Sequence, residues 1–187
     1  MKLQYVKRLE MQMNLLEAEL TSPELPSHFI WTPWNPVFSE IHAQLLHYSF
    51  QNSIDGYIFP TYGQYDACKY LIATSCSSKN FLPSSTWLIQ RKNAVKNPSD
   101  CLQTPCAAIQ SMRVSKEIGQ IQNISTLPRF RHKGLGRALI MKALIGFLQS
   151  GQTVASLEVT AENTEAVCMY EAIGFRPIRH VYTEVII

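Results

Sequence analysis

The sequence predicts one α+β domain behind a short N-terminal extension, and three observations carry this prediction. Segments that alternate apolar and polar residues occur on both sides of apolar helical stripes, so strands and helices are mixed along the chain. The 187 residues, 46% hydrophobic and 17% charged, can bury one sizeable core. A basic turn with two glycines, Arg131 to Arg137, lies between a predicted strand and an apolar helix. We place the extension at residues 1–27 and the domain at residues 28–187.

The first half of the chain predicts two strands and two helices. Residues 8–15 alternate apolar and polar side chains as a half-buried strand does, with a helix as the alternative. Residues 21–27 contain two prolines and connect to a short strand at residues 29–32. Asn35 can cap the next helix, which has Pro36 at its first position and an apolar stripe that ends near Leu46. A second helix is expected over residues 64–77.

The second half predicts a run of strands with two further helices. Strands are expected over residues 86–91, 107–114 and 118–127, with a surface loop at 92–105 and a hairpin turn at 115–117. A helix then runs from Gly134 to Ser150 and ends at Gly151. The order is completed by a strand from Val154 to Thr160, a short helix closed by Gly174, and a final β segment from Arg176 to Ile186.

The turn from Arg131 to Arg137 predicts a site for a phosphate-bearing ligand. The start of a helix leaves several N–H groups without intrahelical acceptors and carries a partial positive charge. Gly134 and Gly136 allow the backbone to approach a ligand closely. Residues 118–157 contain five Lys and Arg and no Asp or Glu, although the net charge of the chain is only +3, so the basicity is local. The alternative is a glycine-containing loop beside a solvated basic face.

The segment from Asn163 to Phe175 predicts a short helix that presents Tyr170. Two helical turns separate Asn163 from Tyr170, so if Asn163 belongs to the first turn, both project from roughly the same face as Ala166. Taken alone, Tyr170 is an amphipathic core residue with its hydroxyl at the rim. Beside a phosphate-binding turn, it becomes a candidate acid.

Together the two motifs resemble those of the GNAT acetyltransferase superfamily. The family's Q/R-x-x-G-x-G/A motif is matched by Arg131, Gly134 and Gly136, and its N-x-x-A-x-x-x-Y-x-x-x-G-F pattern follows at the family's spacing. The similarity runs from about Ala107 to the C-terminus. The first hundred residues resemble uncharacterised bacterial members, including planctomycete sequences, in pattern alone.

The resemblance implies a fold, a reaction and a set of site residues. The fold is a twisted mixed β-sheet flanked by helices, with a splay between central parallel strands. The reaction takes acetyl-CoA, or another acyl-CoA, as donor and a primary amine of a small molecule, peptide or protein as acceptor. The backbone N–H of Leu127 would polarise the thioester carbonyl, and Tyr170 would protonate the departing thiolate. The cofactor-binding residues expected on this basis are Ser125, Leu127, Arg131, His132, Lys133, Gly134, Leu135, Gly136, Arg137, Asn163, Ala166 and Tyr170.

The base that deprotonates the amine is left open by the sequence. The strand at residues 118–127 offers Gln120 and Gln122 where a subset of the family has a carboxylate, and amides do not act as bases at neutral pH. A water chain or an amine that arrives neutral are alternatives to a side chain, and Asp55 also fits a loop cap. The candidate bases are Glu117, Glu158, Asp55 and His47. Aromatic residues that could line the acceptor pocket, but mostly fit the core or rim, are Trp31, Trp34, Tyr48, Tyr57 and Tyr62.

Composition narrows the classes of protein. The mild overall charge argues against a nucleic-acid binder, because the basic cluster coincides with the glycine turn rather than spreading along a groove. The apolar stretches fall short of the roughly 18 residues of a membrane span. The start lacks a signal-peptide core, so a cytoplasmic location is expected. Five cysteines without a C-x-x-C pair favour reduced thiols. His42 and His47 are five residues apart, which suits two ligands on one helix poorly, so no metal is expected.

Two functions fit these patterns. The first is an N-acetyltransferase with an unidentified amine acceptor. The second, favoured by the missing strand carboxylate, is a catalytically weak acyl-CoA-binding module that acts as a sensor or as a subunit of an assembly. A Walker-type nucleotide loop does not fit, because the glycines lack the G-K-[ST] that such a loop requires. The hydrophobic end of the chain, from Glu184, could pair within the sheet or across a homodimer.

Overall fold

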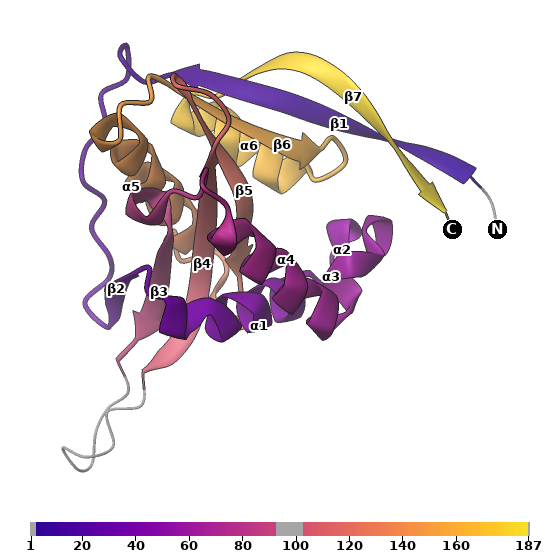
Figure 1. Ribbon diagram of the computed structural model, residues 1–187, viewed down its shortest axis with the longest axis horizontal. Helices are drawn as coiled ribbons and strands as arrows, with labels where there is room; N and C mark the ends of the chain where they lie inside the picture. Colours follow the sequence, from indigo (N-terminus) through magenta and orange to yellow (C-terminus); the bar gives the residue numbers. More distant parts are fainter. Residues whose placement is uncertain (1–2, 93–102, 187) are drawn as a thin grey trace.

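The computed structural model describes residues 3–92 and 103–186 and shows a mixed, twisted β-sheet with helices on both faces (Figure 1). The strands β5 and β6 are parallel, and the other neighbouring pairs are antiparallel. This confirms the predicted sheet. In spatial order, the strands of the described chain are β2 (Phe29–Pro33), β3 (Trp87–Arg91), β4 (Thr104–Arg113), β5 (Ile118–Thr126), β6 (Val154–Thr160), β1 (Leu3–Asn14) and β7 (Arg176–Ile186).

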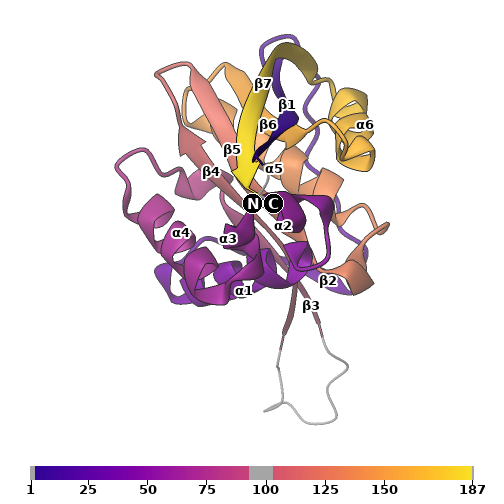
Figure 2. The ribbon, with the colours of Figure 1, turned by 90° about the vertical axis from the view of Figure 1, so that its right-hand side faces the viewer.

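Helices lie on opposite faces of this sheet (Figure 2). One face carries α1 (Ser39–Phe50), which packs on β4 and β5, and the neighbouring α4 (Tyr65–Ser77). Two short helices, α2 (Ile54–Ile58) and α3 (Pro60–Gly63), lie between α1 and α4 in the chain. The other face carries α5 (Leu135–Gln149) and α6 (Thr164–Ile173). Short 3-10 turns precede α1, β3 and α5, at Pro36–Phe38, Pro83–Ser85 and Pro128–Phe130.

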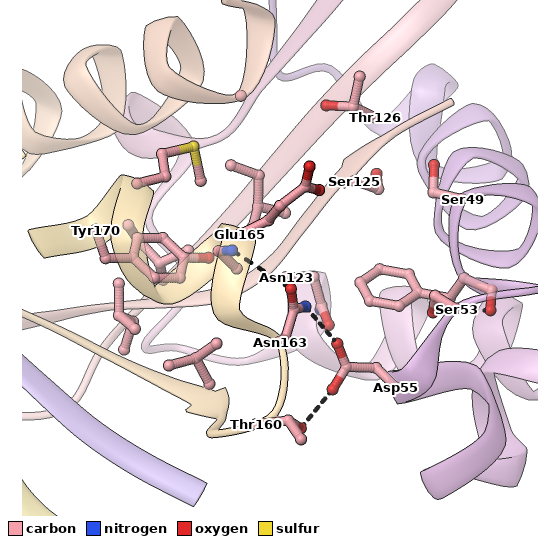
Figure 3. Close-up of a pocket in the computed structure, with 18 of the residues that line it drawn as sticks. Ser49, Ser53, Asp55, Asn123, Ser125, Thr126, Thr160, Asn163, Glu165 and Tyr170 are labelled. Carbon is pink, nitrogen blue, oxygen red and sulfur yellow. Dashed lines mark hydrogen bonds between the residues drawn. The ribbon is translucent and has the colours of Figure 1, made fainter. Parts of the chain in front are cut away.

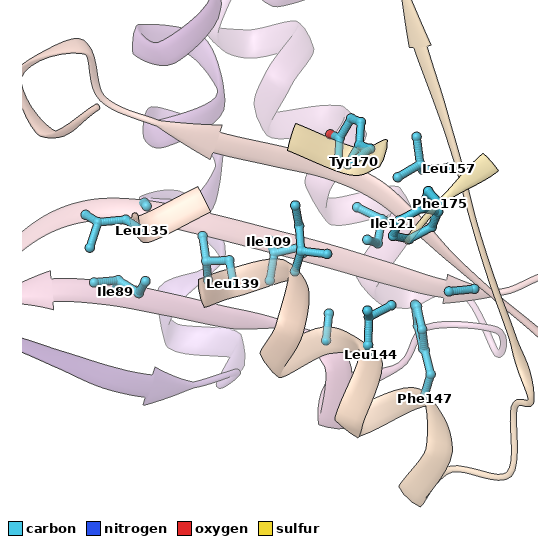
Figure 4. Close-up of a cluster of buried hydrophobic side chains, with 14 of the residues drawn as sticks. Ile89, Ile109, Ile121, Leu135, Leu139, Leu144, Phe147, Leu157, Tyr170 and Phe175 are labelled. Carbon is cyan, nitrogen blue, oxygen red and sulfur yellow. The ribbon is translucent and has the colours of Figure 1, made fainter. Parts of the chain in front are cut away.

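The main hydrophobic core lies between the sheet and α5 with α6 (Figure 4). Leu139, Leu144 and Phe147 of α5 are fully buried against strand residues such as Ile89 and Ile109. The helix comes close to the 3-10 turn before β3: a Cβ at Gly146 would lie 2.4 Å from the Ser84 carbonyl oxygen. The absence of a side chain at Gly146 therefore sets this close packing.

The splay opens where β5 departs from β6. The parallel pairing ends at Ile121 and Leu157. On its other edge, β5 has Ile121 opposite Ser111 and Asn123 opposite Gln110, so Gln122 is an extra residue, a β-bulge. A bulge bends its strand and increases the local twist. β6 stays paired with β1 up to Thr160, so the bend at Gln122 separates β5 from β6. The two strands then diverge from their paired end in the shape of a V, and we call the space between them the V.

The N-terminal strand β1 lies inside the sheet, between β6 and β7. β1 pairs antiparallel with β6 over Arg8–Asn14 and with β7 over Leu3–Gln12. Its side chains therefore flank β6 at the open end of the V. The division into an extension at residues 1–27 and a domain at residues 28–187 stays a prediction.

Most of the predicted elements are present. The strand predicted at residues 8–15 is longer at its start, and β4 begins at Thr104 rather than Ala107. Asn35 caps a 3-10 turn that leads directly into α1. The helices α2 and α3 were missed. The loop predicted at residues 92–105 falls largely outside the described residues. In the described parts of the chain, none of the helices combines the length and apolar character that a membrane crossing requires.

Candidate functional site

A cavity of about 610 Å³ occupies the V between β5 and β6 and reaches the turn before α5 (Figure 3). One wall is formed by the end of β5, the start of α5 and α6. We call this the cofactor wall, residues 124–137 and 163–170. The facing wall is formed by the end of α1, α2 and α3 with side chains of β1 and β6. We call this the acceptor wall, residues 49–62 with Arg8 and Glu158.

The glycine turn forms a helix start with open donors. Gly134 caps α5 in the left-handed conformation, with φ of 76°, which glycine adopts without the penalty of a Cβ. The first helical hydrogen bond runs from Ala138 N–H to the Gly134 carbonyl at 2.9 Å. The N–H groups of Leu135, Gly136 and Arg137 therefore precede the first intrahelical donor, have no intrahelical acceptor and can face an anion.

The basic side chains of this turn have different roles. Arg131 ties the turn to its surroundings: its Nη2 donates to the Ser49 carbonyl at 2.7 Å and its Nε to the Thr126 carbonyl at 3.3 Å. Arg137 and His132 line the cavity and remain the basic side chains placed to meet an anion. Of the predicted turn residues that the structure describes, Lys133 is the one outside the cavity lining.

The hydrogen-bonding pattern between β4 and β5 decides which N–H groups of β5 face the V. The Leu127 N–H donates to the Cys106 carbonyl of β4 at 3.0 Å. In an antiparallel ladder, alternate residues point their N–H and C=O groups to the same neighbour, so Asn123, Ser125 and Leu127 face β4. The N–H groups of Ile124 and Thr126 face the V instead. The prediction that Leu127 polarises a carbonyl is therefore corrected, because its donor is already used inside the sheet.

Tyr170 stands on α6 with its ring in the core and at the cavity. It is 5% exposed, packs edge-on against Phe175 and lines the cavity. Burial raises the pKa of its hydroxyl well above the usual 10, and the negative charge of Asp55 adds to this. Tyr170 is therefore a protonated donor at neutral pH.

Asp55 links the two walls. Its Oδ1 accepts from the Thr160 hydroxyl at 2.5 Å and its Oδ2 from Asn163 Nδ2 at 3.0 Å (Figure 3). Asn163 also caps α6, since its Oδ1 accepts from Ala166 N–H at 3.4 Å. The interpretation of Asp55 as a loop cap is wrong, because Ser53 caps α2 and Asp55 lies in the cavity lining.

Glu158 is the first residue of β6 beyond the point where β5 and β6 separate. Strand alternation puts its side chain on the face opposite to Leu157 and Val159, which belong to the core, and it lines the cavity. Its carboxylate forms an ion pair with Arg8 of β1 at 3.1 Å. Arg8 in turn lies over the ring of Phe59 at 5.0 Å.

The two remaining candidate bases, Glu117 and His47, lie outside the cavity lining. Glu117 is in the exposed hairpin between β4 and β5, at the closed end of the V. His47 is on α1, with its Nδ1 3.1 Å from the Tyr62 carbonyl oxygen. Of the aromatic residues considered for the acceptor pocket, Tyr62 lines the cavity, whereas Trp31 packs on Trp87, and Tyr48 and Tyr57 are exposed.

Several cavity residues were not singled out from the sequence. They include Arg8, Ser49, Phe50, Phe59, Thr126 and Thr160. Arg8 reaches the site because β1 pairs with β6, a pairing between distant segments. For Phe50 and Phe59 a local signal existed, since both flank the stretch that contains Asp55.

The fold and the cavity define an α+β protein with a glycine-capped helix start at one end of a splayed sheet. Residues 102–183 match the family model described as FR47-like protein. An uncharacterized N-acetyltransferase of Methanocaldococcus jannaschii is 37% identical over 60 residues, 32% of this chain and 26% of that protein. The ribosomal protein bS18-alanine N-acetyltransferase of Escherichia coli K12 is 33% identical over 69 residues, 37% of this chain and 47% of that protein. The matches thus span a quarter to a half of these relatives.

Solved structures agree on the fold. A GCN5-related N-acetyltransferase from Sphaerobacter thermophilus aligns with a TM-score of 0.68 at 14% identity, over 97% of this chain and 51% of that chain. The S18-alanine N-acetyltransferase from Escherichia coli aligns with a TM-score of 0.58 at 16% identity, over 81% of this chain and 79% of that chain. This chain therefore has the fold of these N-acetyltransferases, and its residues 102–183 are similar to the FR47-like family.

Proposed function

We propose that the chain is an N-acetyltransferase that moves an acetyl group from acetyl-CoA to a primary amine by direct attack. The observation that carries this proposal is one cavity that contains a helix start with open N–H donors, an open strand edge, a buried tyrosine and a carboxylate. Each of these suits a different part of the reaction. The relatives are named as N-acetyltransferases, which supports the same class.

The cofactor wall fits an acyl-CoA. The first-turn N–H groups of α5, with Arg137 and His132, suit a pyrophosphate. The V-facing N–H groups of Ile124 and Thr126 suit an extended amide-containing arm that runs toward the bulge. Acetyl-CoA supplies the acetyl group as an activated thioester. We assign the Ile124 N–H, which lies nearer the bulge, to polarise the carbonyl of that thioester.

Glu158 is assigned as the base. The attacking amine must lose a proton, and Asp55, Glu158 and Glu165 are the carboxylates of the described cavity lining. Both oxygens of Asp55 already accept side-chain hydrogen bonds, and Glu165 belongs to the first turn of α6. Glu158 stands where β5 and β6 part, on the face of α2 and α3. It accepts the proton from the amine, directly or through one water.

Tyr170 is assigned as the acid. Its hydroxyl is kept protonated by burial and lies across the V from the acceptor wall. It gives its proton to the sulfur of the departing CoA, which balances the proton that Glu158 takes from the amine.

Release of free CoA thiol from acetyl-CoA tests this proposal. Three amines represent different acceptor classes: a hexapeptide with a free N-terminal alanine, 1,4-diaminobutane and the aminoglycoside kanamycin. We expect at least one to accelerate release above hydrolysis, with an acetylated product visible by mass spectrometry. Glu158→Gln should slow this by about a hundredfold. Glu117→Gln, in the distant hairpin, is the matched control and should act like the native chain.

Acetyl-CoA binding without acceleration by any of these amines would contradict the proposal and favour the sensor or assembly subunit. Failure to bind acetyl-CoA would remove both. Because binding is measured separately by calorimetry, the two failures are distinguishable.

A further inference from the structure

The side chain of Arg8 reaches the acceptor wall from the far end of the chain. Because β1 lies between β6 and β7, Arg8 is paired with Thr160 and stands diagonally to Glu158 on the neighbouring strand. Long side chains reach such diagonal neighbours on one face of a sheet. The pairing of β1 with β6 therefore brings the Arg8 guanidinium to the Glu158 carboxylate, at the point where β5 and β6 separate.

Arg8 holds Glu158 at two points. Its Nη1 lies 3.1 Å from Glu158 Oε2, and its Nη2 donates to the Glu158 backbone carbonyl at 3.3 Å. One planar group thus contacts both the main chain and the side-chain end of the same residue, which restricts the side-chain torsions between them. The ion-pair contact at 3.1 Å is made by Oε2.

The guanidinium is itself fixed from the opposite side. Its central carbon lies 5.0 Å from the centre of the Phe59 ring, which belongs to the junction of α2 and α3. The side chain of Arg8 is 22% exposed, against 38% for Glu158. Arg8 is therefore held between Glu158 of β6 and the ring of Phe59, and the carboxylate that it contacts is the more accessible partner.

The arrangement is a poor one for stability alone. Arg8 Nε is buried and has no hydrogen-bond partner among residues 3–92 and 103–186. A partly buried ion pair that leaves one donor unsatisfied recovers little of its desolvation cost. The Arg179–Glu10 pair between β7 and β1 differs, since Arg179 is 69% exposed and two of its nitrogens lie 2.6 and 2.9 Å from Glu10 Oε2.

We propose that Arg8 is a positioning residue that aims the Glu158 carboxylate at the acceptor amine. Arg8 does not itself take the proton: it fixes Glu158 through Oε2 and the main chain, so that Oε1 receives the proton. The N-terminal strand thereby contributes to the reaction as well as to the sheet. This inference rests on the proposed function, in which Glu158 is the base.

A double-mutant cycle tests it, with the fastest amine of the three probes and the full chain. We expect Arg8→Gln to lower kcat about tenfold while the KM for acetyl-CoA stays within about twofold, and Glu158→Gln to lower kcat about a hundredfold. If Arg8 acts through Glu158, the double variant is no slower than Glu158→Gln. Arg8→Lys, which keeps the charge but not the planar two-point contact, should recover only part of the loss.

Multiplication of the two single losses in the double variant would overturn the proposal, because Arg8 would then act independently of Glu158. So would an Arg8→Gln variant as fast as the native chain. Arg179→Gln is the matched control and should leave kcat unchanged. If Arg8→Gln does not fold, Phe59→Leu replaces it: removal of the stacked ring should lower kcat about threefold in the native background and not at all beside Glu158→Gln. A native chain that transfers to no amine fails the proposed function instead.

Discussion

The cofactor wall and the acceptor wall of the same cavity are built in different ways. The cofactor wall comes from two continuous segments, and its main groups are backbone N–H donors of α5 and β5. The acceptor wall depends on side-chain contacts between distant segments, such as Arg8 with Glu158 and Asp55 with Thr160. Every residue of α2 and α3 is at least partly exposed. A backbone site can thus be encoded in one short motif, whereas a side-chain site exists only once the sheet has formed.

The largest effect is expected from a bulky side chain at the start of α5, because it blocks the backbone N–H donors of the cofactor wall. A Cβ at Gly136 would meet Met169 Sδ at 3.7 Å and Thr126 Oγ1 at 3.9 Å, which are ordinary contacts, so Gly136→Leu should fold. Its longer side chain should displace the ligand phosphates. Loss of two charge-assisted hydrogen bonds, each worth about 1.5–3 kcal/mol, predicts an acetyl-CoA Kd weaker by about a thousandfold. Calorimetry checks this against Gly63→Leu, at an open position on α3. A Kd within threefold of the native value would place the ligand elsewhere.

Tyr170→Phe tests the one side chain of the cofactor wall to which we assign chemistry. The ring and its packing against Phe175 are kept, and only the hydroxyl is lost. We expect kcat to fall by a few hundredfold, within the range of about 10²–10⁴ for a general acid, and acetyl-CoA binding to persist. Steady-state kinetics and calorimetry on the same preparation separate the two effects. An unchanged kcat would remove Tyr170 from the reaction.

His42, on the helix α1 whose end belongs to the acceptor wall, tests how the stability of the fold depends on pH. The ring is fully buried, hydrogen-bonds the Gln110 side chain through Nδ1 and packs against Trp34. Burial lowers its pKa from 6.5 to about 3, so the folded state binds this proton more weakly than the unfolded state. The stability that neutral His42 contributes is complete above pH 6.5 and is lost as the pH falls toward 3. At pH 4 the loss is about 3 kcal/mol. Urea unfolding at pH 7 and pH 4 should show this loss, and His42→Gln should reduce it. An equal loss in the variant would assign the pH dependence to other groups.

Asp55→Asn should have the smallest effect. The variant keeps the size of the side chain, but one of the bonds to Thr160 and Asn163 is lost because an amide presents a donor where the carboxylate presents an acceptor. We expect about 1 kcal/mol of lost stability and an amine KM a few times higher. Asp66→Asn, at an exposed position of α4, is the control. A loss in kcat as large as that of Glu158→Gln would make Asp55 the base and contradict our assignment.

The sequence predicted features that depend on neighbours along the chain better than features that depend on contacts between distant segments. The glycine turn and the short helix that carries Tyr170 were predicted from spacing, because each depends on neighbours along the chain. The role of Asn163 as the cap of that helix was not predicted. The choice of Leu127 was wrong, since the direction of a strand N–H depends on the register with β4 and on the bulge at Gln122. Glu158 was one of four candidate bases. Only the pairing of β1 with β6 brings Arg8 beside it.

Amide hydrogen exchange measured by NMR, with and without saturating acetyl-CoA, tests most directly whether the V holds the donor. Ile124 and Thr126 present their N–H groups to the V, whereas the Leu127 N–H is already bonded to Cys106. We predict that acetyl-CoA slows exchange at Ile124 and Thr126 and at the first turn of α5, and leaves Leu127 as it was. Saturation with acetyl-CoA and no added protection at Ile124 or Thr126 would contradict the account, because the ligand would then bind outside the V.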